Sequence, residues 1–180
     1  MSAKTHGTTA FPHTVIMKII LNPKYERLRG YLSHLEEHFN NEGHEIHSGR
    51  NVIRTLEVDD LKLCVKRYAR PSLRRRVQQL IYKPDKAKLA YVRPMLLRER
   101  GFESPESVAS VIYRNGLLNC TTYFVCLHSD YRYNMEQVDL LPADKQRELI
   151  ENFARYTARL HEGGFLHRDF SSSNILYDVI

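Results

Sequence analysis

Near its end the sequence reads Phe165-Leu-His167-Arg168-Asp169-Phe-Ser-Ser-Ser-Asn174-Ile-Leu176. A carboxylate and a side-chain amide, Asp169 and Asn174, stand five residues apart in this short polar segment. An aspartate carboxylate is ionised at neutral pH and can accept a proton. We therefore expect this polar segment to carry a proton acceptor.

His-Arg-Asp followed at this spacing by Asn is the catalytic-loop pattern of protein-kinase-like phosphotransferases. In those enzymes the Asp accepts the proton of the attacking hydroxyl, and the Asn holds Mg²⁺ against the nucleotide phosphates. The resemblance implies that Asp169 is the catalytic base, that Asn174 is a Mg²⁺ ligand and that ATP is the phosphoryl donor. It also implies that His167 and Arg168 brace the catalytic loop and do not react themselves.

A helix is predicted immediately before this loop, over Asp144 to His161. Its large apolar residues recur at helical spacing along one stripe, at Leu149, Phe153, Tyr156 and Leu160. Gly163-Gly164 supplies a stop signal. The predicted helix therefore leads the chain directly into the polar loop.

A β-hairpin is predicted in the first half, with strands over Val52 to Val58 and Leu61 to Tyr68 joined by the polar pair Asp59-Asp60. Successive side chains of a strand alternate between its two faces. One face of the second strand therefore carries Lys62, Cys64 and Lys66, and the other carries Leu61, Leu63 and Val65.

The second strand contains Leu63-Cys64-Val65-Lys66, which resembles the Val-Ala-Ile-Lys strand of protein kinases. In that strand the lysine reaches the nucleotide phosphates, and a small residue on the same face lies over the adenine. The resemblance implies these two roles for Lys66 and Cys64.

Further elements are predicted around this hairpin. Helices are expected over Pro23 to Phe39 and over Pro84 to Arg100, the second bent by Pro94 and ended by Gly101. A second hairpin is expected from strands over Ser107 to Tyr113 and Leu117 to Leu127, with Glu45 to Ser48 as a fifth strand.

This order predicts an α+β fold of the protein-kinase-like type. It comprises an antiparallel β-sheet N-lobe with one helix, followed by an incomplete helical C-lobe. We divide the chain into a loose leader over residues 1–16, the N-lobe over 17–127, and a hinge with the start of the C-lobe over 128–180.

The chain resembles the lipopolysaccharide kinase (Kdo/WaaP) family, in the form found in Bacteroides-like bacteria, over residues 17–180. The resemblance is carried by Met17-Lys-Ile-Ile-Leu-Asn-Pro-Lys-Tyr25, Leu61 to Tyr68, Gly101-Phe-Glu-Ser-Pro105, and Leu160-His-Glu-Gly through Asn174-Ile-Leu176. It implies a cytoplasmic enzyme that transfers the γ-phosphoryl group of ATP to a lipid-linked core sugar of lipopolysaccharide, Kdo or heptose.

Three features depart from the family pattern. Val92 occupies the position of the glutamate that pairs with the lysine, and Ser172-Ser173 replaces Pro-Gly in the loop. The sequence ends at Ile180, before the position of the second metal ligand. We therefore expect a C-terminally truncated chain that is inactive or nearly so in its 180-residue form.

Positive charge is concentrated between Leu61 and Arg100, where thirteen basic residues face two acidic ones. This basic band over residues 62–100 is expected either to be a solvated face or to make peripheral contact with the anionic inner membrane. No apolar run is long enough to span a bilayer. The three cysteines, Cys64, Cys120 and Cys126, lack metal-site or disulfide spacing and are expected to pack in the interior.

Other functions are also compatible with these motifs. An aminoglycoside-type small-molecule phosphotransferase carries a similar loop, and Val92 with the missing ligand favours a catalytically dead nucleotide-binding or partner-binding module. A nucleic-acid binder is not expected, because no recognised binding module occurs. His34-Leu-Glu-Glu-His38 fits a zinc pattern, but helix packing accounts for it, and Gly49 is predicted to lie in a plain loop or in a turn that covers the nucleotide.

Overall fold

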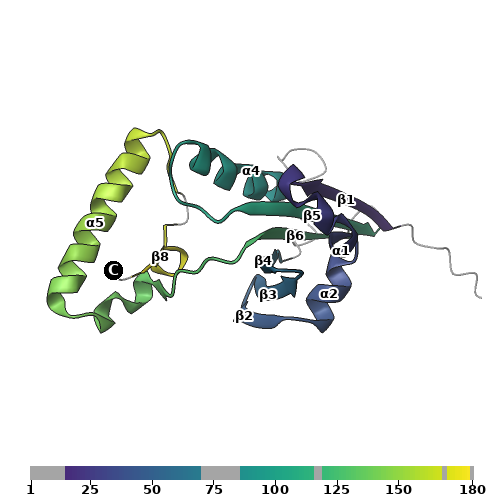
Figure 1. Ribbon diagram of the computed structural model, residues 1–180, viewed down its shortest axis with the longest axis horizontal. Coiled ribbons are helices and arrows are strands. Elements are labelled where there is room, and N and C mark those ends of the chain that lie inside the picture. Colours follow the sequence, from purple (N-terminus) through teal and green to yellow (C-terminus); the bar gives the residue numbers. More distant parts are fainter. Residues whose placement is uncertain (1–14, 70–85, 116–118, 168–169, 179–180) are drawn as a thin grey trace, which may run out of the picture. The chain divides into compact units, whose positions relative to one another are not determined.

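The computed structural model describes residues 15–69, 86–115, 119–167 and 170–178 (Figure 1). Two compact units contain these residues. The first unit takes its described residues from Met1–Met95 and Pro105–His128, and the second takes its own from Leu96–Ser104 and Ser129–Ile180.

The first unit contains a six-stranded antiparallel sheet with strand order β1-β5-β6-β4-β3-β2. Short helices accompany it, so the fold is mixed α+β and is consistent with the predicted kinase-like N-lobe. The strands are β1 (Val15–Leu21), β2 (His44–Ser48), β3 (Val52–Val58), β4 (Leu61–Arg67), β5 (Ser107–Asn115) and β6 (Asn119–Leu127).

Both predicted hairpins are present. β3 and β4 pair in register from Val52↔Arg67 to Val58↔Leu61, and Asp59 makes the turn with a positive φ of 52°. β5 and β6 pair from Ser107↔Cys126 to Asn115↔Asn119. The residues that connect these two strands, 116–118, lie outside the described part of the chain. Alternating side chains and short polar turns were therefore sufficient to predict these pairs of neighbouring strands.

The edge strand β1 was not predicted. Folded structure was expected to begin at Met17, after a loose leader, but Val15 and Ile16 already belong to β1. The strand is held by long-range pairing with β5, in which Lys18 lies opposite Ile112. This partner lies about a hundred residues away in sequence, so local periodicity gives no sign of it.

The single helix expected over Pro23 to Phe39 is wrong. The segment forms a 3-10 helix η1 (Pro23–Leu28) and two short α-helices, α1 (Arg29–Ser33) and α2 (Leu35–Asn41). The α-helices are separated at His34, whose φ of −109° and ψ of 19° are not helical. Apolar residues at helical spacing within these segments, among them Leu32, Leu35 and Phe39, are nevertheless buried.

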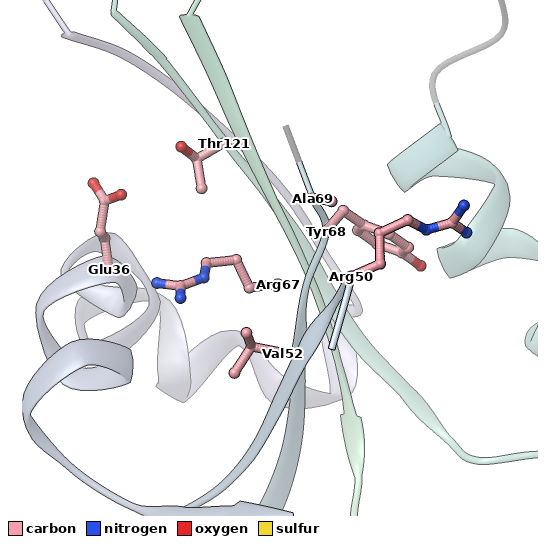
Figure 2. Close-up of a pocket in the computed structure, with 7 residues that line it drawn as sticks. All are labelled: Glu36, Arg50, Val52, Arg67, Tyr68, Ala69 and Thr121. Atoms are coloured by element: carbon pink, nitrogen blue, oxygen red, sulfur yellow. The ribbon is translucent and has the colours of Figure 1, made fainter. Parts of the chain in front are cut away.

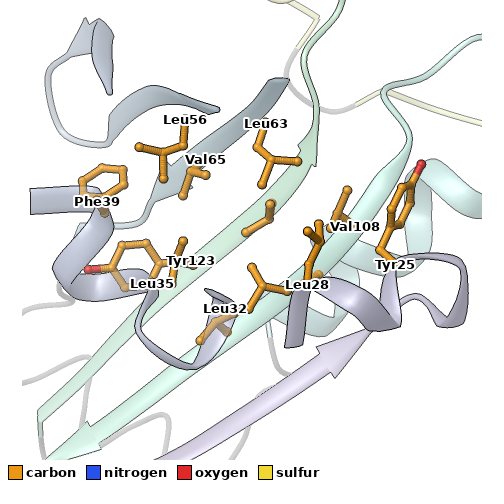
Figure 3. Packing of buried hydrophobic residues seen from close by; sticks show 13 residues of the cluster. Tyr25, Leu28, Leu32, Leu35, Phe39, Leu56, Leu63, Val65, Val108 and Tyr123 are labelled. Carbon is orange, nitrogen blue, oxygen red and sulfur yellow. The ribbon is translucent and has the colours of Figure 1, made fainter. Parts of the chain in front are cut away.

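These helical segments cover one face of the sheet with a hydrophobic core (Figure 3). From the helices come Leu32, Leu35 and Phe39, each fully buried, and Phe39 meets Tyr123 of β6 edge-on with ring centroids 5.3 Å apart. Leu63 and Val65 of β4 are also fully buried in this cluster. Burial of each such side chain stabilises the fold by roughly 1.5–3 kcal/mol.

The helix α4 (Lys86–Glu99) follows β4 in the described chain and ends as the sequence predicts. Gly101 has a φ of +77°, and the amide of Phe102 donates to the carbonyl of Leu97 at 2.9 Å. A glycine with positive φ after the last turn and a bond of this span are typical of a helix C-terminal cap. Residues Lys86–Met95 of α4 belong to the first unit.

The second unit is built around α5 (Ala143–Glu162), which matches the predicted helix closely. A two-stranded sheet joins β7 (Tyr133–Asn134) to β8 (Leu176–Tyr177), and two 3-10 helices, η2 (Met135–Leu140) and η3 (Ser172–Asn174), complete the unit. Phe102 packs edge-on against Tyr156 and Phe165. Within the described residues, no helix combines the length and apolar character needed to cross a membrane.

Gly43 is required by the backbone at the entry to β2. Its φ is +77°, and a β-carbon placed there would stand 2.2 Å from the backbone oxygen of Thr55. We expect Gly43→Ala to lower the free energy of unfolding by at least about 2 kcal/mol, because both strain and a backbone clash oppose it. Chemical denaturation measures this. Gly30→Ala in α1, where nothing lies within 4 Å, is the control and should stabilise by up to about 1 kcal/mol; equal effects of the two changes would contradict the structure.

The core phenol of Tyr123 predicts alkaline sensitivity. Burial, followed by the nearby Glu36 carboxylate, raises the pKa of Tyr123 to about 12. An unfolded tyrosine loses its proton near pH 10, so between pH 10 and 12 the unfolded state binds fewer protons and stability falls as pH rises.

We expect Tyr123→Phe to reduce this fall by about 1 to 2 kcal/mol, after allowing for solvent screening. Denaturation curves at pH 9, 10 and 11 measure it. An unchanged slope in Tyr123→Phe would contradict the buried phenol.

Candidate functional site

The predicted nucleotide lysine lies on an interior strand of the sheet. Lys66 pairs with Ile53 of β3 on one side and with Phe124 of β6 on the other, so its backbone is held from both directions. Its side chain is half-buried, and its ammonium lies 5.7 Å from the centroid of the Tyr68 ring. A cation over an aromatic face at this distance is attracted to it, which favours one orientation of the flexible lysine.

Cys64 shares the face of Lys66, as strand alternation predicts. Leu63 and Val65 point into the core beneath α1 and α2, whereas Cys64 is half-buried and Lys62 is exposed. The strand therefore presents a small side chain and a lysine, two residues apart, on the face opposite the main core.

Helix α4 contacts this second face at Ser107. Ser107 of β5 lies opposite Cys126 of β6, and its buried hydroxyl donates to the backbone carbonyl of Tyr91 at 2.9 Å. The next residue, Val92, is half-buried and has no charge to offer a lysine. Within the described residues, no carboxylate forms an ion pair with Lys66. The missing glutamate at Val92 therefore has no replacement in the described part of the chain.

The turn before β3 is tied to the end of β4. The amide of Gly49 donates to the carbonyl of Asn51 at 3.2 Å, and the amide of Ala69 donates to the side-chain oxygen of Asn51 at 3.1 Å. Arg50 stands between them and is exposed. Figure 2 shows Arg50 and Tyr68 on one side of the strands, with Arg67 and Glu36 on the other.

A cavity of about 340 Å³ opens at this end of the sheet, beside the lysine strand (Figure 2). Its described lining does not include Lys66 or Cys64. Two arginines line it, Arg50 and Arg67, and Arg67 lies 4.7 Å from the centre of the Phe39 ring and donates to the side-chain oxygen of Asn40 at 3.0 Å. Because its guanidinium is already engaged in these contacts, we assign Arg67 a structural role. The described lining is Glu36, Arg50, Val52, Arg67, Tyr68, Ala69 and Thr121.

In the second unit, aromatic contacts hold the start of the predicted catalytic loop. His167 is exposed, and its ring lies 5.3 Å from that of Phe170. Phe170 in turn stacks on Phe153 of α5, with centroids 5.3 Å apart and planes 27° apart. Phe153 belongs to the apolar stripe found in the sequence, so the stripe of α5 supports the loop that follows it.

The end of the loop is held by the small sheet. Asn174 closes the turn η3, where its amide donates to the carbonyl of Ser171 at 3.0 Å, and its side chain is exposed. The next carbonyl, that of Ile175, accepts from the amide of Met135 at 3.0 Å. Tyr177 then stacks on Tyr133 across β7 and β8. With Ser172-Ser173 in it, the turn forms a compact 3-10 helix.

The predicted site residues thus fall into two sets. Lys66 and Cys64 lie in the first unit, and His167 and Asn174 lie in the second. Arg168 and Asp169 lie outside the described residues. That these sets act on one nucleotide stays a prediction. The sequence alone did not predict that Cys126 lies opposite Cys64, because that prediction requires the register between β4 and β6.

The histidines of the zinc pattern around His34 have other structural roles. His34 lies at the break between α1 and α2, while His38 hydrogen-bonds Glu42 at 2.8 Å and stacks on Tyr31. The part of the chain that the structure describes has no group of three or more metal-ligating side chains of the His, Cys, Asp and Glu types.

No model of a known protein family matches the chain, and no curated protein matches its sequence. A solved structure described as "WaaP in complex with acyl carrier protein" is similar, with 14% sequence identity and a TM-score of 0.39. The similarity covers 66% of this chain and 44% of that one.

The stack on α5 gives a test of the loop. We expect Phe153→Ala to speed amide hydrogen exchange over residues 165–175 by roughly tenfold, because a lost aromatic contact of about 1–1.5 kcal/mol raises the population of open loop. Mass spectrometry after deuterium labelling measures this. Ile150→Ala, one turn away and 51% exposed, is the control and should leave the loop unchanged; equal protection in both variants would contradict the stacking.

Proposed function

We propose that this chain is part of an ATP-dependent phosphotransferase of the lipopolysaccharide core (Kdo/heptose) kinase type. The supporting observation is the arrangement on β4, which places Lys66 and the small Cys64 on the face that α4 contacts. In protein kinases the lysine is on the third strand after the start of the nucleotide lobe, and the helix that follows is αC. Here the lysine is on β4, which β1, β2 and β3 precede, and α4 is the next helix in the described part of the chain.

Each residue would contribute to positioning or to charge neutralisation, which dominate catalysis of phosphoryl transfer. The Lys66 ammonium would bind the nucleotide phosphates, and Cys64 would leave room for the adenine. The turn over residues 49–51, fixed to Ala69 through Asn51, would lie over the phosphates, with Arg50 as an additional cation. Gly49 would then lie in a turn that covers the nucleotide, which is one of the two placements that its sequence leaves open.

In the second unit, Asp169 would accept the proton of the acceptor hydroxyl as its oxygen attacks the γ-phosphorus. The exposed Asn174 fits a Mg²⁺ ion, because a side-chain amide oxygen is a hard ligand and Mg²⁺ usually completes its shell with phosphates and water. Bound Mg²⁺ would neutralise charge on the phosphates. His167 would brace the loop through Phe170.

The acceptor that we propose is a lipid-linked core sugar, reached from the cytoplasmic side of the inner membrane. The basic band supports this location, since its described members Lys62, Lys88, Arg93, Arg98 and Arg100 are exposed. Clustered cations of this kind are attracted to anionic lipid surfaces.

Nucleotide binding tests the proposal. We expect MgATP to raise the melting temperature of the chain, and Lys66→Met to abolish most of that shift because the phosphates lose their cation. Lys62→Met is the matched control, since Lys62 lies on the same face of the same strand but is exposed; it should retain the shift. No MgATP shift in the unchanged chain, or equal loss in both variants, would overturn the proposal.

Turnover separates the alternatives that share this fold. Phosphorylation of a lipid-linked Kdo or heptose acceptor supports the lipopolysaccharide kinase, whereas phosphorylation of an aminoglycoside alone supports the small-molecule phosphotransferase. A MgATP-dependent melting shift without turnover on either acceptor fits both the binding module that Val92 suggests and a kinase that is inactive in this 180-residue form.

A further inference from the structure

Two of the three cysteines face each other across neighbouring strands. Cys64 of β4 lies directly opposite Cys126 of β6. Two residues along, the amide of His128 donates to the carbonyl of Lys62 at 2.8 Å, so Lys62 and His128 are a hydrogen-bonded pair. Because hydrogen-bonded and non-hydrogen-bonded pairs alternate along antiparallel strands, Cys64 and Cys126 are a hydrogen-bonded pair as well. The α-carbons of such a pair are about 5.5 Å apart, a separation that disulfides commonly bridge.

The two thiols differ in access and in acidity. Cys64 is half-buried, whereas Cys126 is 6% exposed, and the Cys126 thiol donates to the Cys64 carbonyl at 3.7 Å. A side-chain hydrogen bond between the two thiols lowers the pKa of Cys64, and the Lys66 ammonium acts in the same direction. The hydrogen bond with Cys64 and burial raise the pKa of Cys126 well above its usual value. Cys64 is therefore the thiol better suited to attack.

We propose that Cys64 and Cys126 are a redox modification site, which a low-molecular-weight disulfide such as glutathione disulfide converts reversibly to a cross-strand disulfide. We further propose that this bond weakens nucleotide binding at the face that carries Lys66. The second part rests on the proposed function, and the first does not.

The reaction proceeds by two thiol–disulfide exchanges. The Cys64 thiolate attacks one sulfur of glutathione disulfide, forms a mixed disulfide and releases one glutathione thiolate. The Cys126 thiol gives up its proton, and its thiolate attacks the Cys64 sulfur, which breaks the mixed disulfide and releases the second glutathione. The two cysteines lose two electrons and two protons in total, and one glutathione disulfide becomes two glutathione thiols.

The bond should be labile. Side chains directly opposite in antiparallel strands have β-carbons about 4.5–5.5 Å apart, whereas a disulfide prefers about 3.5–4.5 Å. The pair must therefore draw β4 and β6 together locally, and a strained disulfide is reduced more readily. The same movement displaces Cys64 from the proposed adenine position, on the strand that also carries Lys66.

Cys120 provides the matched control. It also lies on β6, but six residues from Cys126, where it is opposite Arg114 of β5. Its sulfur contacts the Thr122 hydroxyl at 3.7 Å. Strand spacing of about 3.3 Å per residue keeps it far from Cys64 along the sheet.

The test exposes the folded 180-residue chain to glutathione disulfide, blocks free thiols and maps the linked peptides by mass spectrometry. We expect a Cys64–Cys126 link in the unchanged chain and in Cys120→Ser, removed in both by dithiothreitol. Cys126→Ser should stop at glutathione on Cys64, and Cys64→Ser should give neither product. Thiols that stay reduced, or a link that involves Cys120, would overturn the redox site.

Nucleotide binding forms the second arm. We expect the MgATP affinity of the oxidised chain to be at least about tenfold lower than that of the reduced chain, with recovery after dithiothreitol. Equal affinity in the two forms overturns the effect on the nucleotide. No binding by the reduced chain overturns the proposed function together with that effect, while the mass-spectrometric result still judges the disulfide by itself.

Discussion

The alternation of side chains along β4 is the constraint on which the arrangement of the first unit depends. Leu63 and Val65 are fully buried beneath α1 and α2, which fixes the register of an interior strand paired on both sides. A slip of one residue would bring lysine side chains into the core and expose the leucine and valine. The burial of two apolar residues therefore determines where Lys66 points, although neither of them has a functional role.

The two faces of the sheet consequently have different tasks. One face holds the hydrophobic core, in which Tyr123 meets Phe39. The other contacts α4 through the bond from Ser107 to Tyr91 and carries the lysine and the cysteine pair. Since the same register places Cys64 beside Lys66 and opposite Cys126, the proposed nucleotide site and the proposed redox site follow from one strand pairing. The second unit supports its own loop separately, through the stripe of α5.

Local patterns predicted the parts of this structure that depend on neighbours in sequence. Alternation around Asp59-Asp60 gave the β3–β4 hairpin, and the apolar stripe gave α5 together with Phe153, which supports the loop. The break at His34 was missed because the apolar spacing continues across it. The strand β1 and the contact of Cys64 with Cys126 were missed because each needs a partner distant in sequence, which periodicity does not identify. The motif spacing predicted roles for Asp169 and Asn174, and both roles stay predictions. Asn174 belongs to the described residues, whereas Asp169 lies outside them.

Covalent labelling by an acyl phosphate of ATP tests the nucleotide site most directly. Such a reagent transfers its acyl group to an amine held beside the phosphates, forms an amide and releases ATP, and mass spectrometry identifies the modified lysine. A lysine that binds the phosphates predicts acylation at Lys66, prevented by excess MgATP. Labelling spread over exposed lysines such as Lys62 and Lys88, and unaffected by MgATP, would contradict the phosphate-binding role of Lys66.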